Sequence, residues 1–469
     1  MHHPPQGRFV SRHIRKLSRS AGFAGVLGVF LTGIAIVTPP FQGADEDRHF
    51  MRAYQLSELA FLPIKHDGQL GGILPAAVVD SVRTLFGNRG QPWDRHLIAR
   101  ELASRPAGSP RVFESFPNTA LYSPVAYAPQ VVGIWIGQLF GLPPVALVWL
   151  ARLGSVVTAV VSALLAMRIA PAYRCLLVPL FFLPMFAFQN AIVSADCLLF
   201  CASAVLFALT MKVLETDGAP SAAWSTPTVA IAACTAVLLL TKPTYFPMAM
   251  PAGLAVVLAA HRAGGVRSGM LSAAAMAAAF LPALWWNLQV SDLFVGANPD
   301  VVVDPRGQAA FIHEHPATFL GICLASCVQQ SRHLFQQFVG VLGWLDTPLP
   351  RRANDLLGCG LAAPLLIAGL NARMAIWFRA TLLLTILTQV VAICGFVYAS
   401  WCPVGQEWVS GLQGRYFLPL AAFALVAASP DPPVAGRDPR RDSMVLGLNW
   451  ISVLMSVAIT IVTLVRRYF

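Results

Sequence analysis

The chain has 469 residues, of which 56% are hydrophobic and 12% are charged, and its mean hydropathy is positive. An ordinary soluble domain carries about 25% charged residues, whereas runs of ~20 apolar residues, each long enough to cross a bilayer, recur along this chain. Composition therefore excludes a soluble globular protein. It predicts an all-α integral membrane protein in which residues 21–469 form a single polytopic domain.

The net charge of +11 lies mainly in short loops and tails. Lys and Arg in short loops mark the cytoplasmic side of a membrane protein, so this charge reports topology and gives no support to nucleic-acid binding. We expect residues 1–20 to form a basic cytoplasmic tail and residues 21–40 to cross outward. The basic positions are Arg8, Arg12, Arg15, Lys16, Arg19, Arg168, Arg174, Arg262, Arg267, Arg373, Arg379, Arg437, Arg440 and Arg441.

Three consecutive carboxylates, Asp45, Glu46 and Asp47, follow the first apolar segment and a Pro-Pro pair. If the chain becomes helical here, Asp45, His49 and Arg52 share one face, because residues three or four apart are neighbours on a helix. We interpret this stretch as the start of a functional site. The alternative is a solvated first helical turn, where acids suit the positive end of the helix dipole.

Residues 42–118 read as a large first outer loop, broken into short pieces by glycines and prolines. The next stretch, 119–141, is apolar but carries two prolines, so it either crosses the membrane or forms an interfacial or re-entrant helix. If it crossed, Arg168 and Arg174 would fall outside. We therefore favour a helix that lies flat at the outer interface.

Two long apolar runs are each interrupted by polar residues near the middle. The run 176–210 is too long for one span and contains Asp196, and the run 226–260 contains Lys242 before a helix-breaking proline. Each run is predicted to be a helical hairpin with its corner at the outer face. Asp196 and Lys242 would then lie on the same side as Asp45.

The remainder predicts a second outer loop at 291–352, which holds Asp346, and a basic cytoplasmic loop at 430–442. Arg415 and Tyr416 open a span at the outer interface. Arg415 is either a snorkelling anchor or a bidentate phosphate ligand. Altogether the sequence predicts about 11 transmembrane helices, within a range of roughly 10–13.

Several motifs in this order resemble the DUF2142 family of bacterial membrane proteins, over nearly the whole chain. They are Pro39 to His49, Ser194-Ala195-Asp196, Lys242-Pro243, Gly343-Trp344-Leu345-Asp346-Thr347 and Gln413-Gly414-Arg415-Tyr416-Phe417-Leu418-Pro419. That family in turn is similar to the GT-C class of glycosyltransferases. The resemblance implies a GT-C-like fold whose first outer loop contains interface-lying helices, in the bacterial inner membrane.

The implied activity is transfer of a sugar from a polyprenyl-phosphate donor to a cell-envelope glycan or lipid acceptor, as in polysaccharide biosynthesis. Such chemistry needs a carboxylate base, cations on the departing phosphate and an apolar groove for the isoprenoid. Asp45 is the expected base, with Glu46 as the alternative and His49 orienting or assisting. The expected donor-phosphate ligands are Lys242, Arg415 and Tyr416.

Further expected site residues are Arg52, Asp196 and Asp346, which would orient the acceptor or support the site. Metal dependence stays open from the sequence. If a divalent cation such as Mg²⁺ or Mn²⁺ takes part, Asp45, Glu46 and Asp196 are its expected ligands, because hard cations prefer carboxylate oxygens.

Two other functional classes compete with sugar transfer. A transporter or flippase of a lipid-linked saccharide also uses intramembrane charges and broken helices, but its site usually lies at the bilayer midplane between repeats. A polysaccharide polymerase or ligase, or a purely structural subunit, is a further alternative. The gathering of polar residues at the outer face and the acidic first loop favour the transferase.

Overall fold

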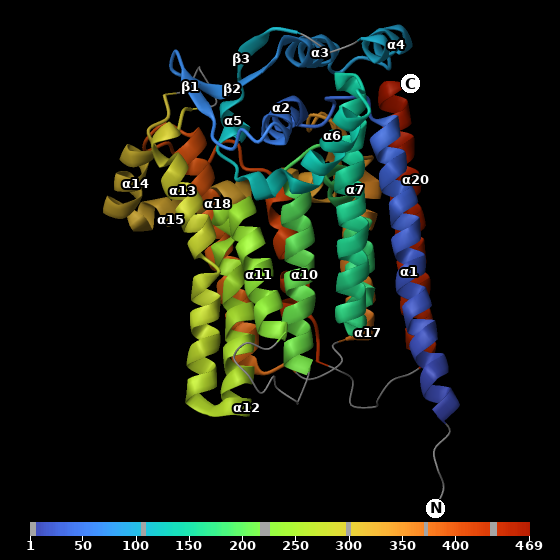
Figure 1. Ribbon diagram of the computed structural model, residues 1–469. Coiled ribbons are helices and arrows are strands. Elements are labelled where there is room, and N and C mark those ends of the chain that lie inside the picture. The colour runs from blue at the N-terminus through green and yellow to red at the C-terminus, as the bar shows by residue number, and fades with distance from the viewer. Residues whose placement is uncertain (1–5, 105–108, 216–225, 297–301, 370–373, 432–438) are drawn as a thin grey trace, which may run out of the picture.

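The long apolar runs form the long helices of the protein, which stand side by side in one bundle (Figure 1). The computed structural model describes residues 6–104, 109–215, 226–296, 302–369, 374–431 and 439–469. The long helices are α1 (Gln6–Val37), α7 (Pro144–Ile169), α10 (Asp196–Glu215), α12 (Ala249–Ala278), α17 (Arg351–Ala368), α18 (Ile376–Trp401) and α20 (Pro439–Tyr468).

The bundle has two distinct ends (Figure 1). Residues 38–104 and 109–143 cover one end, which we call the loop end, and the C-terminus of α20 lies there too, while α1 begins at the opposite end. Residues 6–19 of the predicted basic tail are already helical as part of α1. Residues 1–5 of the tail, and 432–438 of the predicted loop 430–442, lie outside the described residues.

Six helical segments within the described ranges are long and apolar enough to cross a membrane, or up to eight if each of two bent helix pairs is one span. The predicted 11 spans are not confirmed. One reason is that α11 (Thr226–Thr241) and the segment Gly414–Ala428 are shorter than a full span. Another is that Pro243–Leu293 is one segment of 51 residues by this test, although the chain turns back within it at Gly265, whose φ is 70° (Figure 1).

The two bent pairs interrupt the apolar runs at prolines. Helices α8 (Arg174–Phe181) and α9 (Pro184–Ala191) meet at 76°, and α14 (Pro305–Glu314) and α15 (Pro316–Gln329) meet at 107°. The remaining short elements after residue 143 are η2 (Pro171–Tyr173), η3 (Pro243–Met248), α13 (Leu281–Val290), η4 (Ser291–Leu293), α16 (Ser331–Gly340), β4 (Val341–Leu342), β5 (Thr347–Pro348), η5 (Gly414–Leu420) and α19 (Ala421–Ala428).

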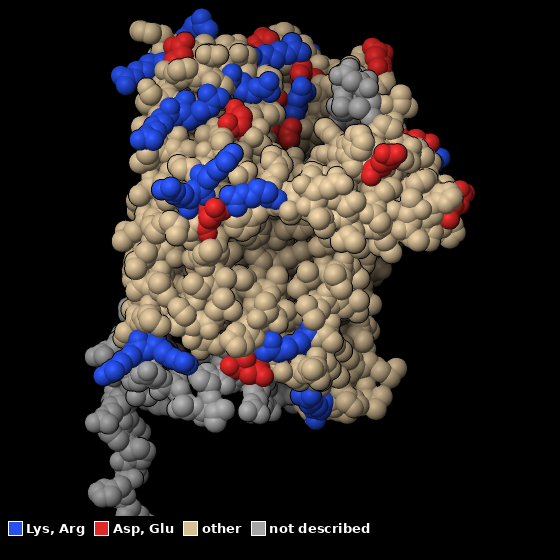
Figure 2. Space-filling view, turned by 180° about the vertical axis from the view of Figure 1, so that it is seen from behind, with Lys and Arg blue, Asp and Glu red and all other residues tan. Residues whose placement is uncertain are grey.

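The distribution of charge on the surface agrees with a multi-pass membrane protein. Figure 2 shows Lys, Arg, Asp and Glu gathered over the upper part and along the lower edge, with a broad band of uncharged residues between them. Such a band is what the hydrocarbon core of a bilayer requires of the helices that face it.

The first loop folds into short helices and a small sheet at the loop end. Its elements are α2 (Glu46–Ser57), β1 (Ile64–His66), β2 (Gln69–Pro75), α3 (Ala76–Gly87), α4 (Arg95–Ala103), β3 (Arg111–Ser115), α5 (Pro117–Ala120), η1 (Pro124–Tyr127) and α6 (Ala128–Leu139). Helix α4 begins where the Asp94 side chain accepts hydrogen bonds from the next turn, a standard N-cap.

The first loop also contains a small three-stranded sheet within this otherwise helical protein. Strand β2 pairs antiparallel with β1 on one side and β3 on the other, with Gly72 opposite Glu114. The glycines at 71 and 72, which the sequence presents as breaks, lie inside β2. A Cβ at Gly71 would overlap the backbone of Glu114, and one at Gly72 would lie 2.8 Å from the Gln55 side-chain nitrogen, so close packing requires glycine at both positions.

Helix α6 has only 12 residues, about 18 Å of helix, too short to cross a bilayer core of about 30 Å. It packs against α7 through two glycines, since a Cβ at Gly133 would overlap the Leu150 carbonyl and one at Gly154 would overlap that of Pro129. Its opposite face leaves Trp135 and Leu139 exposed. Because the chain does not cross here, α1 ends and α7 begins at the same end of the bundle, the loop end.

The apolar residues form two cores. One fills the helix bundle, and the other lies between the first loop, α6 and the upper part of α7. The second core includes Phe50 of α2, Tyr127 of η1 and Val193, which lies in the turn between α9 and α10. The first loop is therefore anchored on the turn that precedes Asp196.

Candidate functional site

Asp196, Lys242 and Arg415 meet at the loop end although they come from distant segments. Asp196 is the first residue of α10, Lys242 follows α11 directly, and Arg415 lies in η5. The Lys242 Nζ lies 2.5 Å from Asp196 Oδ1, and the Arg415 Nε lies 3.8 Å from Asp196 Oδ2. The side chains of Asp196 and Arg415 are only 5% and 6% exposed. The structure therefore brings together these three predicted site residues.

Aromatic rings enclose the two cations. The Lys242 Nζ lies 5.7 Å from the centre of the Tyr122 ring and 5.5 Å from that of Tyr416, and the Arg415 guanidinium is 5.7 Å from the same Tyr416 ring. The Tyr245 hydroxyl donates to the Tyr416 carbonyl at 2.8 Å, which fixes η3 against η5. Cation–π contacts of this kind hold a cation in place without neutralising it.

Arg415 keeps unused hydrogen-bonding capacity. Its Nε and its Nη1 are buried and have no hydrogen-bond partner among the described residues. Buried polar groups are nearly always hydrogen-bonded, so orphaned donors point to a missing ligand or water. Guanidinium N–H groups without a partner match the oxygens of a phosphate or carboxylate.

Asp45 lies beside this cluster, and much of the hydrogen-bonding capacity of its carboxylate is unused. It is the N-cap residue of α2 in a left-handed conformation, with φ 57° and ψ 14°, and its side chain does not cap the helix. The carboxylate accepts a hydrogen bond from the Asn118 side chain at 3.0 Å and, within the described ranges, forms no ion pair. Asp45 lies close enough to Arg415 for their charges to interact. A half-buried carboxylate is thus held near the Arg415 guanidinium.

His49 lies one helical turn after Asp45 and faces the same cluster. Its Nδ1 is 2.6 Å from the Tyr127 hydroxyl, and its charge would interact with Asp196, Lys242 and Arg415. Burial lowers the pKa of His49 to about 3 because the imidazolium would lose its hydration. The imidazole is therefore neutral at physiological pH. It suits orientation by hydrogen bonding better than proton uptake.

Glu46 has a different environment and is not free to act as a base. Its carboxylate forms a bidentate pair with Arg152 of α7, with Arg152 Nε at 2.8 Å and Nη2 at 2.7 Å, and both side chains are fully buried. Arg152 also donates to the carbonyls of Ala35, Thr38 and Pro39 at the end of α1. All five guanidinium donors are used.

The same carboxylate joins the two loops that carry the acids of the site. Glu46 Oε1 accepts from the Val193 backbone N–H at 3.0 Å, and Oε2 accepts from that of Gly43 at 3.4 Å. One bond reaches the turn before Asp196 and the other the turn before Asp45. The Glu46–Arg152 pair thus fixes both turns to α7, and a catalytic role for Glu46, the expected alternative to Asp45, would require this buried pair to open.

Arg52 and Asp346, the other expected site residues, make structural contacts. Arg52 is fully buried and donates to the carbonyl of Tyr122 at 3.0 Å, which holds the Tyr122 ring segment near Lys242. Asp346 accepts from Arg467 of α20 at 2.9 Å and from the Thr347 hydroxyl, and its side chain is 41% exposed. Asp346 therefore joins the second loop to the C-terminal helix, and none of its described contacts reaches Asp196.

Asp47, between Glu46 and Arg48, is buried and incompletely paired. Burial raises the pKa of Asp47 to about 6, although the Arg48 guanidinium at 3.1 Å lowers it. Its Oδ1 has no hydrogen-bond partner in the described part of the chain. The three consecutive acids therefore have three different environments.

The expected metal ligands do not come together. No group of three or more His, Cys, Asp or Glu residues that could hold a metal ion is found among the described residues. Glu46 is paired with Arg152 and Asp196 with Lys242, so two of the three expected ligands are already occupied by cationic side chains.

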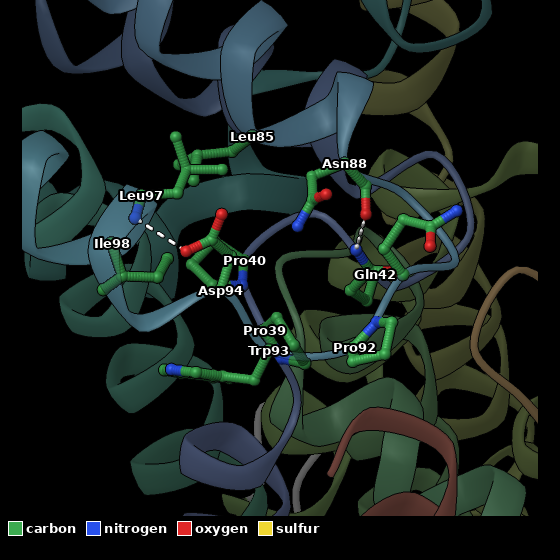
Figure 3. A pocket seen from close by; sticks show the side chains of 11 residues that line it. Pro39, Pro40, Gln42, Leu85, Asn88, Pro92, Trp93, Asp94, Leu97 and Ile98 are labelled. Atoms are coloured by element: carbon green, nitrogen blue, oxygen red, sulfur yellow. Dashed lines mark hydrogen bonds between the residues drawn. The ribbon is translucent and has the colours of Figure 1, made fainter.

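The turn after α1 is covered by the segment that joins α3 to α4. Figure 3 shows a small pocket between the Pro39–Pro40 turn and the segment that joins α3 to α4, where Gln42 donates to the Asn88 carbonyl at 3.4 Å. Its volume is about 10 Å³, room for about one water molecule. The residues around this pocket pack closely against the Pro-Pro turn and leave no space for a substrate.

Four residues of the site escaped the sequence analysis: Asn118, Tyr122, Tyr127 and Arg152. Arg152 had a usable signal, because a charged residue within the apolar run of α7 is expensive unless it is paired. Tyr122 and Tyr127 lie in the segment 119–141, where the sequence indicated an apolar helix but gave no sign of a binding site. Nothing in the spacing of Asn118 relates it to Asp45.

Comparison with known proteins gives one match. Residues 28–424 match the family model described as predicted membrane protein (DUF2142). No curated protein and no solved structure matches the chain. The match covers most of the chain, including the end of α1, the first loop, and the segments of Asp196, Lys242 and Arg415. This chain therefore belongs to the DUF2142 family of predicted membrane proteins.

Proposed function

We propose that this protein is a GT-C-like glycosyltransferase that moves a sugar from a polyprenyl-phosphate donor to a cell-envelope glycan or lipid acceptor. The observation that carries the proposal is the meeting of Asp45, Asp196, Lys242 and Arg415 at one end of a membrane bundle. A base and two cations close together are what transfer from a lipid phosphate requires.

The loop end is assigned to the outer face of the bacterial inner membrane. This assignment rests on the basic residues near the start of α1, which favour a cytoplasmic N-terminus. A lipid-linked donor with its phosphate at the outer interface would then present its sugar to the first loop. The site at the loop end, rather than at the midplane, favours the transferase over a transporter.

Asp45 is the proposed base. It is half-buried and unpaired, so it can accept the proton of an acceptor hydroxyl, whereas Glu46 is saturated by Arg152. The buried neutral His49 orients the acceptor or the carboxylate through hydrogen bonding.

Lys242 and Arg415 are proposed to bind the donor phosphate and to stabilise it as it leaves. In the structure Asp196 occupies part of their hydrogen-bonding capacity and keeps them in place, while the orphaned Arg415 donors remain for the phosphate. Tyr416 contributes the ring that lies beside both cations.

The test is the Asp45→Asn variant, assayed for transfer with a panel of hexose and pentose polyprenyl phosphates in membrane vesicles. Transfer by the wild-type protein should be abolished in the variant, because the amide cannot accept the proton, while folding and insertion are unchanged. Asp67→Asn is the matched control, since Asp67 is an exposed acid of the same loop. Full activity of a normally inserted Asp45→Asn protein would remove Asp45 as the base.

A further inference from the structure

An apolar hollow lies beside the charged cluster. It has a volume of about 300 Å³ and opens between α15, α16, α18 and η5. No polar atom contributes to its exposed lining. The lining residues are Cys327, Leu334, Phe335, Phe338, Val390 and Phe417.

The hollow and the charged cluster share one wall, the short helix η5. Arg415 of this helix pairs with Asp196, and Phe417, two residues later, lines the hollow. Helix α16 is fixed against the start of η5, because Gly414 N donates to Gln337 Oε1 at 2.8 Å and a Cβ at Gly414 would overlap the Leu334 carbonyl. Helix η5 therefore presents Arg415 to the charged cluster and Phe417 to the hollow.

The chemistry of the two regions is that of a lipid phosphate. Lys242 and Arg415 share the paired carboxylate of Asp196, Asp45 lies near Arg415, and Arg415 still has two donors without partners among the described residues. An anionic head therefore suits the cluster, and a hydrocarbon chain suits the hollow.

The burial of the cations restricts the kind of lipid. The side chains of Arg415 and Lys242 are 6% and 16% exposed, so a phosphate must enter the protein to reach them. A phosphate joined directly to a single chain can do this. A glycerophospholipid would have to bring its glycerol and a second chain into the same space.

From these contacts we infer that the hollow holds the first isoprene units of the lipid-linked donor, while its phosphate reaches Lys242 and Arg415. This inference rests on the proposed function and adds the route of the donor. The lipid enters sideways from the bilayer between α15, α16 and α18.

The experiment uses the full chain in nanodiscs and a polyprenyl phosphate that carries a diazirine near the phosphate. Light should attach the probe to peptides of α16 and η5. Unlabelled polyprenyl phosphate should compete, whereas an equal concentration of phosphatidylglycerol should not. Labelling elsewhere, or equal competition by phosphatidylglycerol, would overturn the inference.

Two variants fill the hollow from opposite sides, Leu334→Trp on α16 and Val390→Trp on α18. Each should reduce labelling about tenfold or more, and the second keeps the test valid if the first fails to fold. Leu324→Trp is the control, because Leu324 is 68% exposed on α15 and does not line the hollow. Unreduced labelling in folded variants of both positions would contradict the inference.

The outcome for the donor route can be separated from that for the activity. Sugar transfer with labelling outside the hollow overturns the route and leaves the proposed function standing. Neither transfer with any donor of the panel nor labelling by the probe would overturn both.

Discussion

Two buried ion pairs at the loop end differ in how completely their polar atoms are used. Glu46 and Arg152 are fully buried, and every donor of the guanidinium has an acceptor. Asp196 is also buried and pairs with Lys242, but Arg415 lies 3.8 Å away and keeps two donors without partners among the described residues. We call the Glu46–Arg152 pair closed, because all its donors have acceptors, and the cluster of Asp196, Lys242 and Arg415 open, because two donors lack them.

The difference separates a structural pair from a candidate site. A closed pair has no atoms to offer a ligand and is costly to break, because removal of one partner leaves a buried charge. An open cluster can bind an anion with little rearrangement. Burial alone therefore does not distinguish the two, and the hydrogen-bond inventory does.

The largest effect is expected from Arg152→Leu, which breaks the closed pair. Glu46 would remain buried without a cation, so the free energy of unfolding should fall by about 3–5 kcal/mol. Thermal unfolding of the purified protein in detergent measures this loss. The control is Arg168→Leu on the same helix, because Arg168 is exposed and should change stability little. Equal thermal stability of the Arg152 and Arg168 variants would contradict a structural role for the closed pair.

A smaller effect, and one on binding rather than stability, is expected from Arg415→Gln in the open cluster. Loss of a charge-assisted hydrogen bond should weaken polyprenyl-phosphate binding by about 1.5–3 kcal/mol. Lys242→Ala should weaken it by a similar amount. Titration with the lipid in nanodiscs gives the affinity, and Arg332→Gln, a surface pair with Asp355, is the control. Unchanged affinity in both cluster variants would remove the phosphate assignment.

The sequence predicted the membrane class and much of the open cluster. Polar interruptions in long apolar runs predicted that the chain turns near Asp196 and Lys242, and α10 indeed begins at Asp196 while Lys242 ends α11. The number of spans was not confirmed, because proline-broken and short helices do not obey a rule based on the length of apolar runs.

The closed pair could not be predicted from the sequence. Nothing in residue spacing links Glu46 to Arg152, which is 106 positions later, and the pairing follows only from how the first loop packs against α7. The small sheet was missed for a similar reason. Its glycines are required by contacts with Gln55 and Glu114, which come from other segments of the loop.

A further prediction concerns His49, which borders the open cluster. Its pKa is about 3 in the folded protein and 6.5 in the unfolded chain, so the unfolded chain binds the proton first as the pH falls. Stability should therefore decrease from pH 6.5 toward 3, by at most about 1.4 kcal/mol per pH unit. His49→Gln keeps a hydrogen-bonding partner for Tyr127 and should lack this decrease, which thermal unfolding at several pH values would reveal. Parallel pH profiles for the wild type and the variant would contradict it.

At Asp47, beside the closed pair, the pH effect is smaller than at His49 and has the opposite sign. The folded protein holds the Asp47 proton up to about pH 6, whereas the unfolded chain releases it near 3.8. Relative to Asp47→Asn, the wild type should lose stability as the pH rises through this window of about two units. Because the His49 contribution rises with pH over the same window, the two variants should shift the pH profile in opposite directions. A shift in the same direction would mean that the buried acid beside the closed pair is already ionised through its contact with Arg48.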